Sequence, residues 1–295
     1  MKLLGKYRNG NFITTIFDDG TKIRQTKEGE FKPSFAENCD IKITNYCDMG
    51  CPMCHENSTT EGSHGDLSLP FLKNLHPYTE LAIGGGNALA HPDLIPFLES
   101  LKEQKVIANL TVNERHFFEK QDLIKELIDK KLIRGLGVSL TDASDEFIDA
   151  IKQFPTAVIH TINGMLSKEQ IEKLTDNNLK LLILGFKNFR RGVDYLNNNN
   201  KQVEERQKYL YDNLKSLIHR FKLVSFDNLA LEQLEVKRFL TPEEWETFYM
   251  GDDGSMTFYI DLVNKKFASS SISTKRYDIL DTIDDMFKTV LEEKI

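Results

Sequence analysis

Apolar and polar positions along this chain alternate between two patterns, one typical of β-strands and one typical of α-helices. Between residues 40 and 186, six short apolar runs have the length and bounding turns of strands, and segments with the 3.6-residue period of helices lie between them. This alternation predicts parallel strands joined by right-handed crossovers. The predicted strands cover residues 40–44, 80–84, 106–112, 133–140, 157–162 and 179–186, and the predicted helices 68–75, 93–104, 121–131, 145–152, 167–175 and about 202–220.

The sequence therefore predicts an α/β fold. An open doubly wound sheet and a barrel both fit the alternation, and six strand–helix units are too few for a complete eight-unit barrel. The regions on either side of this core have different patterns.

In the N-terminal region, apolar and polar residues alternate over residues 12–17, Asp18-Asp19-Gly20 is a hairpin-turn signal, and residues 21–26 are predicted to form the second strand of the hairpin. We thus expect a small β element over residues 1–37, a core over 38–225 and an extension over 226–295.

The extension is less regular than the core. One more strand is predicted at residues 222–226, a capped helix at 241–249 and a hairpin over 256–271 that turns at Val263-Asn264. Apolar residues recur with a helical period over 277–295, which predicts an amphipathic terminal helix.

Composition narrows the classes of function. The formal net charge is −7 with both signs interspersed, and no basic block marks a nucleic-acid footprint. No apolar run is long enough to span a membrane, and the first residues do not resemble a signal peptide. We therefore expect a cytoplasmic protein. In that reducing compartment, a tight cysteine cluster indicates metal or redox chemistry rather than disulfides.

Three of the four cysteines crowd into one loop. Cys47, Cys51 and Cys54 form a C-x3-C-x2-C motif directly after the first core strand, at the strand end where parallel α/β folds place their chemistry. Cys39 precedes that strand, so about 16 Å of strand should separate it from the motif. Three thiolates suit zinc completed by His55 or His64, or a four-iron cluster with one iron left open.

A second motif favours the iron cluster. The stretch LAIGGGNALAHPDL at residues 81–94, together with C-x3-C-x2-C, resembles the radical S-adenosylmethionine (radical SAM) enzymes. The resemblance implies a partial (β/α)6 TIM-like barrel in which Cys47, Cys51 and Cys54 hold one [4Fe-4S] cluster whose open iron chelates S-adenosylmethionine. Asn87 stands where the family has Glu, and Ala88 where it often has Pro. An amide at position 87 can accept a hydrogen bond from the methionyl ammonium but brings no charge.

The resemblance also assigns cosubstrate contacts. It implies that Met53 lies against the adenine, that Gly85 and Gly86 expose backbone beside the ligand, and that Ser139 meets the ribose or carboxylate. Asn113 is a further candidate contact, although turn chemistry also explains an asparagine at a strand end. Phe186-Lys187 and Arg190-Arg191 follow the sixth strand, and they either meet the substrate or the cosubstrate carboxylate or form a solvated basic loop. The predicted cosubstrate contacts are therefore Met53, Gly85, Gly86, Asn87, Asn113 and Ser139.

The implied activity is reductive cleavage of S-adenosylmethionine to a 5′-deoxyadenosyl radical that abstracts hydrogen from a substrate. The electron would come from a donor such as flavodoxin or ferredoxin. No cysteine follows Cys54, which excludes a second cluster on ligand count. A peptide or protein substrate is favoured by the hairpin and by a possible edge strand in residues 1–37. A nucleotide or small metabolite, and a non-catalytic Cys3His zinc module, are the alternatives.

Overall fold

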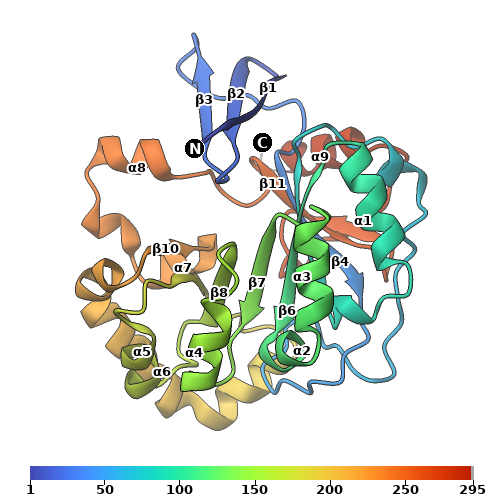
Figure 1. Cartoon of the computed structure of the whole chain (residues 1–295). Helices are drawn as coiled ribbons and strands as arrows, with labels where there is room; N and C mark the ends of the chain where they lie inside the picture. Colours follow the sequence, from blue (N-terminus) through green and yellow to red (C-terminus); the bar gives the residue numbers. More distant parts are fainter. Residues whose placement is uncertain (294–295) are drawn as a thin grey trace.

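The computed structural model describes residues 1–293, and one large sheet dominates them (Figure 1). Its strand order is β10-β9-β8-β7-β6-β5-β4-β11-β12-β13. All neighbours from β10 to β11 are parallel, and β12 and β13 are antiparallel to theirs. The predicted parallel α/β core is thus confirmed. Its strands are β4 (Asn38–Thr44), β5 (Glu80–Gly85), β6 (Ile107–Asn113), β7 (Gly135–Ser139), β8 (Ala157–Ile162), β9 (Lys180–Leu184) and β10 (Leu223–Phe226).

The sheet buries one face under helices and leaves the other more polar. Apolar side chains alternate along each strand toward the helices, as in β4, where Cys39, Ile41 and Ile43 are almost fully buried. Among the described strands the sheet stays open, with β10 and β13 at its edges, and it does not close into a barrel. The covering helices are α1 (Leu94–Glu103), α2 (Glu114–Glu119), α3 (Gln121–Asp129), α4 (Asp145–Ile151), α5 (Lys168–Leu174) and α6 (Arg191–Leu217).

Three predicted helices have different limits in the structure. Residues 68–75 contain only the 3₁₀ turn Pro70–Lys73, which ends where Asn74 leaves helical backbone with a φ of −133° and a ψ of 44°. The helix expected from about residue 202 begins already at Arg191 and is interrupted at Asn199, whose backbone is not helical. The terminal helix α9 (Ile283–Glu292) begins after its cap Thr282, because Tyr277–Asp278 pairs with the sheet as β13 instead. Residues 294 and 295 of this prediction lie outside the described residues.

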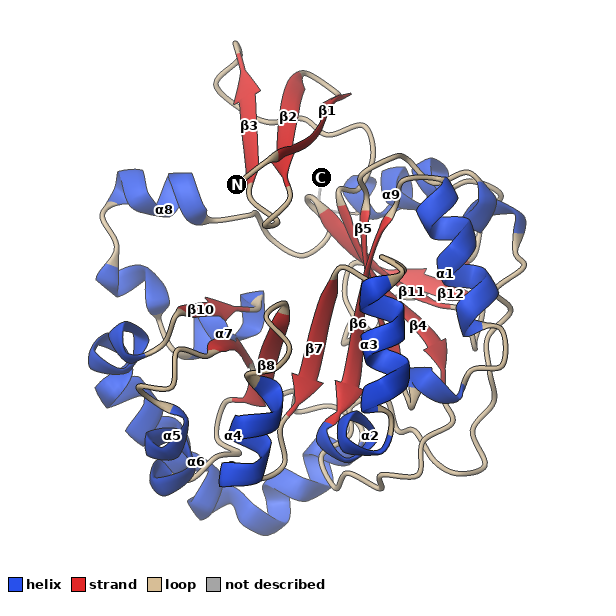
Figure 2. Cartoon of the chain, in the orientation of Figure 1, coloured by secondary structure: helices blue, strands red, loops and turns tan. Residues whose placement is uncertain are grey.

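The N-terminal element is a separate three-stranded antiparallel sheet, β1 (Leu3–Asn9), β2 (Phe12–Phe17) and β3 (Lys22–Thr26). It packs where the core strands begin: Lys22 Nζ lies 2.9 Å from Glu80 at the start of β5, and Arg134, just before β7, donates to the carbonyl of Phe17 over 2.6 Å. The arrows of β6 and β7 point away from it (Figure 2). This sheet therefore lies at the end of the core opposite the cysteine loop.

The C-terminal region extends the core sheet. The predicted hairpin is confirmed as β11 (Thr257–Asp261) and β12 (Lys266–Ala268), and β11 lies parallel beside β4. Phe287 of α9 packs near Phe258 of β11, with ring centroids 6.0 Å apart. Two short helices, α7 (Asn228–Gln233) and α8 (Pro242–Phe248), connect β10 to β11, with the 3₁₀ turn Val236–Phe239 between them.

Candidate functional site

The cysteine motif lies in a loop that closes on itself after β4. The amide of Cys47 donates to the carbonyl of Thr59 over 2.8 Å, and the amide of Thr59 donates back to the carbonyl of Asn45 over 3.1 Å. Gly62 leaves no space for a side chain, since an added Cβ would lie 2.0 Å from Asn45 O. The strand end and residue 59 thus form a fixed base from which the cysteines project.

Gly85, the last residue of β5, and Gly86 pack against the end of β4 and the start of the same loop. The amide of Gly86 donates to Thr44 O over 2.8 Å, and a Cβ at Gly86 would lie 2.1 Å from Tyr46 O. Gly85 has a φ of +109°, and a Cβ there would lie 2.4 Å from Thr44 O. The space that these two glycines leave is therefore occupied by the backbone of Thr44, the last residue of β4, and of Tyr46 in the loop. Their contact with a cosubstrate stays a prediction.

Asn87 carries an unused acceptor beside this junction. Its amide donates to Tyr46 O over 2.7 Å, which fixes the residue against the cysteine loop. Its side-chain Oδ1 is buried and has no hydrogen-bond partner among the described residues. Such orphaned buried acceptors are costly and rare in proteins, and a bound donor removes the cost. An ammonium group is the donor that the sequence predicts at this position.

The three cysteine side chains are partly buried and close enough to influence one another. Burial raises the pKa of Cys47 and of Cys51, and the charge of the neighbouring thiols adds to the rise in both. Among residues 1–293 no three Cys, His, Asp or Glu side chains are gathered closely enough to hold a metal ion. Convergence of the sulfurs on one centre thus stays a prediction. Cys39 is fully buried at the start of β4, away from the loop.

Helix α2 holds the loop from the side of β6. Asn113 caps this helix, with its Oδ1 accepting from Arg115 N over 2.9 Å, so the expected turn chemistry is present. His116 and Arg115 both contact Asp48 between the first two cysteines, His116 Nε2 at 2.7 Å from Oδ1. Nothing in the sequence pattern pairs His116 with Asp48, because the contact depends on how β6 lies relative to β4.

Polar side chains form a row across the open face of the sheet. The register pairs Asn113 with Ser139, and Ser139 with His160 on β8. His160 lies against Gly137, where an added Cβ would be 2.3 Å from its ring. Burial lowers the pKa of His160 to about 4, so the ring is neutral near pH 7. The contact of Ser139 with a cosubstrate stays a prediction, and the sequence analysis did not identify its neighbour His160.

A buried charged network joins the loop to the C-terminal region. Glu56 is contacted by Lys42 Nζ at 3.0 Å and by the Tyr259 hydroxyl at 3.0 Å, and Lys42 also lies 3.4 Å from Asp261. Burial opposes the charge of Glu56, but His55 and Lys42 hold the pKa of this carboxyl well below its usual range. A network with both signs present and hydrogen-bonded is stable when complete and costly to break.

The start of α6 covers the other side of the loop. Arg190 donates to Glu56 O over 3.0 Å, and Arg191 Nη2 donates to Ser58 O. Gly192 brings the helix to Met53, whose carbonyl oxygen would lie 3.8 Å from a Cβ at that glycine. The predicted contact of Met53 with an adenine stays untested by this geometry.

The two histidines proposed as zinc ligands have other partners. His55 Nε2 lies 3.3 Å from Lys187 Nζ and 3.4 Å from Glu56 Oε1. His64 Nδ1 lies 2.9 Å from Thr44 Oγ1, and its ring packs against His91. Neither joins the cysteines in a metal-holding group within the described residues.

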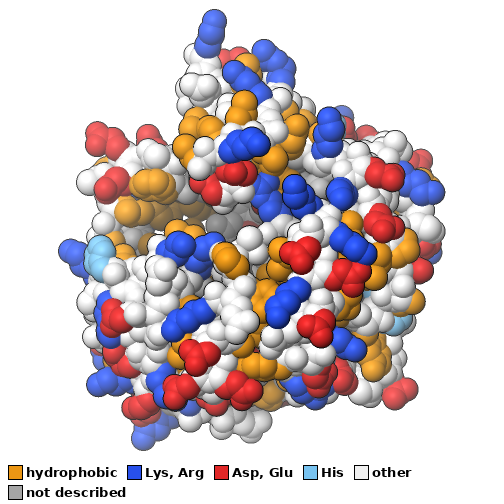
Figure 3. Space-filling model, in the orientation of Figure 1, with side chains coloured by type: hydrophobic (Ala, Val, Ile, Leu, Met, Phe, Trp, Pro, Cys, Tyr) orange, Lys and Arg blue, Asp and Glu red, His pale blue; other side chains and the backbone are white. Residues whose placement is uncertain are grey.

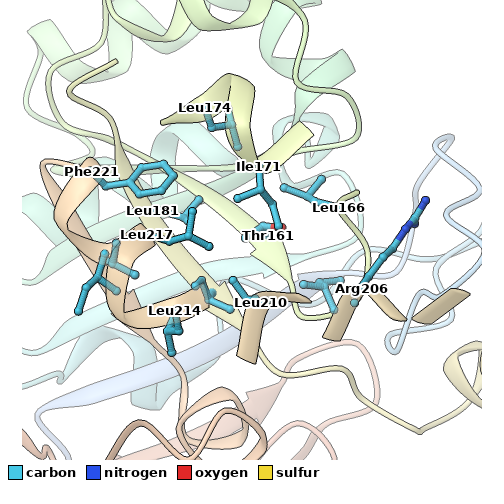
Figure 4. A pocket seen from close by; sticks show the side chains of 15 residues that line it. Thr161, Leu166, Ile171, Leu174, Leu181, Arg206, Leu210, Leu214, Leu217 and Phe221 are labelled. Carbon is cyan, nitrogen blue, oxygen red and sulfur yellow. The ribbon is translucent and has the colours of Figure 1, made fainter. Parts of the chain in front are cut away.

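Grooves lie both beside the extension and beside α6. A groove of about 750 Å³ near α8 is bordered by Trp245, Tyr249 and Asp253. Figure 3 shows the surface hollowed below α8, between this helix and the core. A second, polar groove of about 580 Å³ lies between α6 and the ends of β8 and β9. The enclosed gap in Figure 4, between β8, β9, α5 and α6, has about 20 Å³ and apolar walls, so we regard it as a packing gap in the core.

The fold is similar to that of SuiB from Streptococcus suis. SuiB bound to its precursor peptide SuiA aligns with 87% of this chain at 16% identity and a TM-score of 0.57, and SuiB bound to S-adenosylmethionine aligns with 87% at 14% identity and 0.55. The chain spans just under two thirds of the SuiB chain. No protein-family model and no curated protein matches the sequence. In the described part of the chain, no helix has the length and apolar character to cross a membrane.

Proposed function

We propose that this protein is a radical SAM enzyme with a single [4Fe-4S] cluster held by Cys47, Cys51 and Cys54. The observation that carries the proposal is the junction of two motifs: the Gly85-Gly86-Asn87 segment is hydrogen-bonded to the base of the cysteine loop, and Asn87 Oδ1 is a buried acceptor without a donor among residues 1–293. When bound, the cluster supplies the electron that cleaves S-adenosylmethionine to a 5′-deoxyadenosyl radical, which abstracts hydrogen from the substrate.

The protein's own residues bind and orient. Asn87 accepts from the methionyl ammonium, and Met53, Gly85 and Gly86 border the cosubstrate. Asn113 and Ser139, neighbours in the strand register, present polar groups to its ribose or carboxylate. The Lys42–Glu56 network keeps the loop rigid from beneath, because each buried charge has an opposite partner.

We further propose a peptide or protein side chain as the substrate. The fold similarity to SuiB, whose structure was solved with a precursor peptide, supports this choice. In this proposal residues 38–225 are the radical SAM core, and residues 226–295 are a lid or docking surface beside the groove near α8. The N-terminal β element lies at the end of the core opposite the cysteine loop. A peptide paired to its edge strand would therefore have to extend along the sheet to reach that loop. We place the enzyme in the cytoplasm with flavodoxin or ferredoxin as electron donor.

Anaerobic reconstitution tests the function. Purified protein should bind four iron and four sulfide ions, and with dithionite and S-adenosylmethionine it should release 5′-deoxyadenosine and methionine. Cys54→Ala is the matched negative control. A colourless protein that binds one zinc and produces no 5′-deoxyadenosine would support the zinc module instead. If the cleavage occurs, deuterium transfer from labelled peptide extracts or labelled small-molecule extracts into 5′-deoxyadenosine distinguishes peptides from metabolites.

A further inference from the structure

The face of the core sheet that the helices leave uncovered is open to solvent at the middle of its strands. Asp40 on β4 and Ala82 on β5 are partners in the strand register, and both are exposed, although each of these strands has a paired strand on either side. On the opposite face of the same strands, Ile41 and Ile83 are almost fully buried. A ligand can therefore reach the centre of the sheet from its open face.

Three neutral polar side chains on this face have no partner. Thr111, Ser139 and His160 belong to the adjacent strands β6, β7 and β8. Each is half-buried, and none of their side chains makes a hydrogen bond or an ion pair within residues 1–293. Their polar atoms are also not among the buried atoms that lack a partner there, so they stay accessible. Together they offer hydrogen bonds to a molecule bound on the open face.

The position of the His160 ring depends on a glycine of the neighbouring strand. A Cβ at Gly137 would lie 2.3 Å from Cε1 and 2.5 Å from Nε2 of His160, and 3.0 Å from Thr111 Oγ1. The absence of a side chain at residue 137 thus lets the imidazole lie over β7 and approach Thr111. Because burial keeps this ring neutral near pH 7, it carries one donor and one acceptor nitrogen.

We propose that His160 and Thr111 are substrate-binding residues that hydrogen-bond a backbone amide of the peptide substrate. This inference rests on the proposed function and names the residues that hold its peptide. A peptide unit presents one donor and one acceptor, which a neutral imidazole and a hydroxyl can both satisfy. Thr111 precedes Asn113 on the same face of β6, and His160 pairs with Ser139. The substrate contacts therefore lie directly beside the proposed cosubstrate contacts.

The test uses the reconstituted enzyme with dithionite, S-adenosylmethionine and a deuterium-labelled peptide extract. His160→Leu should reduce deuterium transfer into 5′-deoxyadenosine about tenfold, because the substrate amide loses its partner. The yield of 5′-deoxyadenosine without extract and the dissociation constant of S-adenosylmethionine should stay within about twofold of the parent values.

Three further variants complete the series. His160→Gln keeps one donor and one acceptor and should retain about half of the transfer or more. Thr111→Val removes only a hydroxyl at nearly constant shape and should reduce transfer about threefold. His219→Leu removes an exposed histidine that has no hydrogen bond in the described part of the chain, and it should leave the transfer unchanged.

Unchanged transfer in both His160→Leu and Thr111→Val overturns the inference. Equal losses of transfer, of cleavage without extract and of cosubstrate affinity also overturn it, because His160 would then contact S-adenosylmethionine. If His160→Leu lowers the melting temperature or does not fold, Thr111→Val decides, and normal transfer in that variant assigns His160 a structural role. Transfer from labelled small-molecule extracts alone overturns the peptide as ligand. A parent protein that binds no iron would instead refute the proposed function.

Discussion

The backbone amide of Asn87 donates to the carbonyl oxygen of Tyr46 over 2.7 Å. This bond joins two motifs that lie about 40 residues apart in the sequence, the glycine-rich end of β5 and the base of the cysteine loop. It uses only the backbone of Asn87, whose buried side-chain Oδ1 has no partner in the described residues. The position therefore offers a direct test of cosubstrate binding.

Asn87→Ala should weaken binding of S-adenosylmethionine by about 1 kcal/mol, or several-fold in affinity, because one neutral hydrogen bond to the ammonium is lost. Asn87→Glu should retain or tighten binding, since a carboxylate makes a charge-assisted bond. Anaerobic titration of the cosubstrate into the three reconstituted proteins measures this. Equal dissociation constants for the parent and the alanine variant would show that the ammonium is held elsewhere.

The close packing of the glycine motif on the cysteine loop should also contribute to the stability of the protein. Gly86→Ala places a Cβ 2.1 Å from Tyr46 O, so the loop or the strand end must move. We expect a loss of about 1–3 kcal/mol in the free energy of unfolding, the usual cost of overpacking. Gly84→Ala is the matched control, because its nearest contact is Thr111 Cβ at 4.0 Å, and it should change stability by less than about 1 kcal/mol. Urea unfolding compares them, and equal stabilities would mean that the close approach is not maintained in solution.

Cys51 should be a cluster ligand, whereas Cys39 should be a core residue that binds no iron. Cys51→Ala leaves two thiolates in the loop, too few to hold a four-iron cluster, so the bound iron and the yield of 5′-deoxyadenosine should both fall to background. Cys39→Ala should retain the iron and lose only about 1 kcal/mol of stability, as for a small side chain removed from the core. Iron analysis after reconstitution measures both. Iron lost on Cys39→Ala alone would contradict the assignment of ligands.

His160 should make stability depend on pH. Its pKa is about 4 in the folded protein, against about 6.5 in an unfolded chain. Between these values the unfolded chain binds a proton that the folded protein does not, so the stabilisation is complete above pH 6.5 and is lost as the pH falls toward 4. About 2 kcal/mol should disappear between pH 8 and pH 5.

The comparison for His160 is a neutral variant. His160→Gln does not titrate, so the difference in unfolding free energy between parent and variant should shrink or reverse as the pH falls from 8 to 5. Urea unfolding of the parent and of the variant at pH 8 and pH 5 gives the four free energies of unfolding that the comparison requires. A constant difference would show that His160 keeps an ordinary pKa and is open to solvent.

Local pattern was sufficient for much of the fold. The six predicted core strands all form, in order and in parallel, because apolar runs of five to eight residues between helical segments have few other ways to bury their side chains. The terminal helix shows the limit of this reasoning. Its period extends over residues 277–295, yet Tyr277–Asp278 pairs with β12 and the helix starts only at Ile283. For residues 277–278 the pattern permits either helix or strand, and pairing with β12 at the edge of the sheet selects the strand.

The sequence by itself determined the parts of the site that are local: three cysteines after a strand end, and glycines followed by Asn87 after the next strand. Only the tertiary structure decided what surrounds them. The parallel pairing of β11 with β4 brings Tyr259 to Glu56 across about 200 residues, and the packing of α6 leaves Arg191 without a carboxylate among the described residues. Periodicity reports which face of an element is buried, but not which distant element covers it. That choice depends on the combined packing of the whole chain, so the charges around the cysteines could not be predicted from spacing.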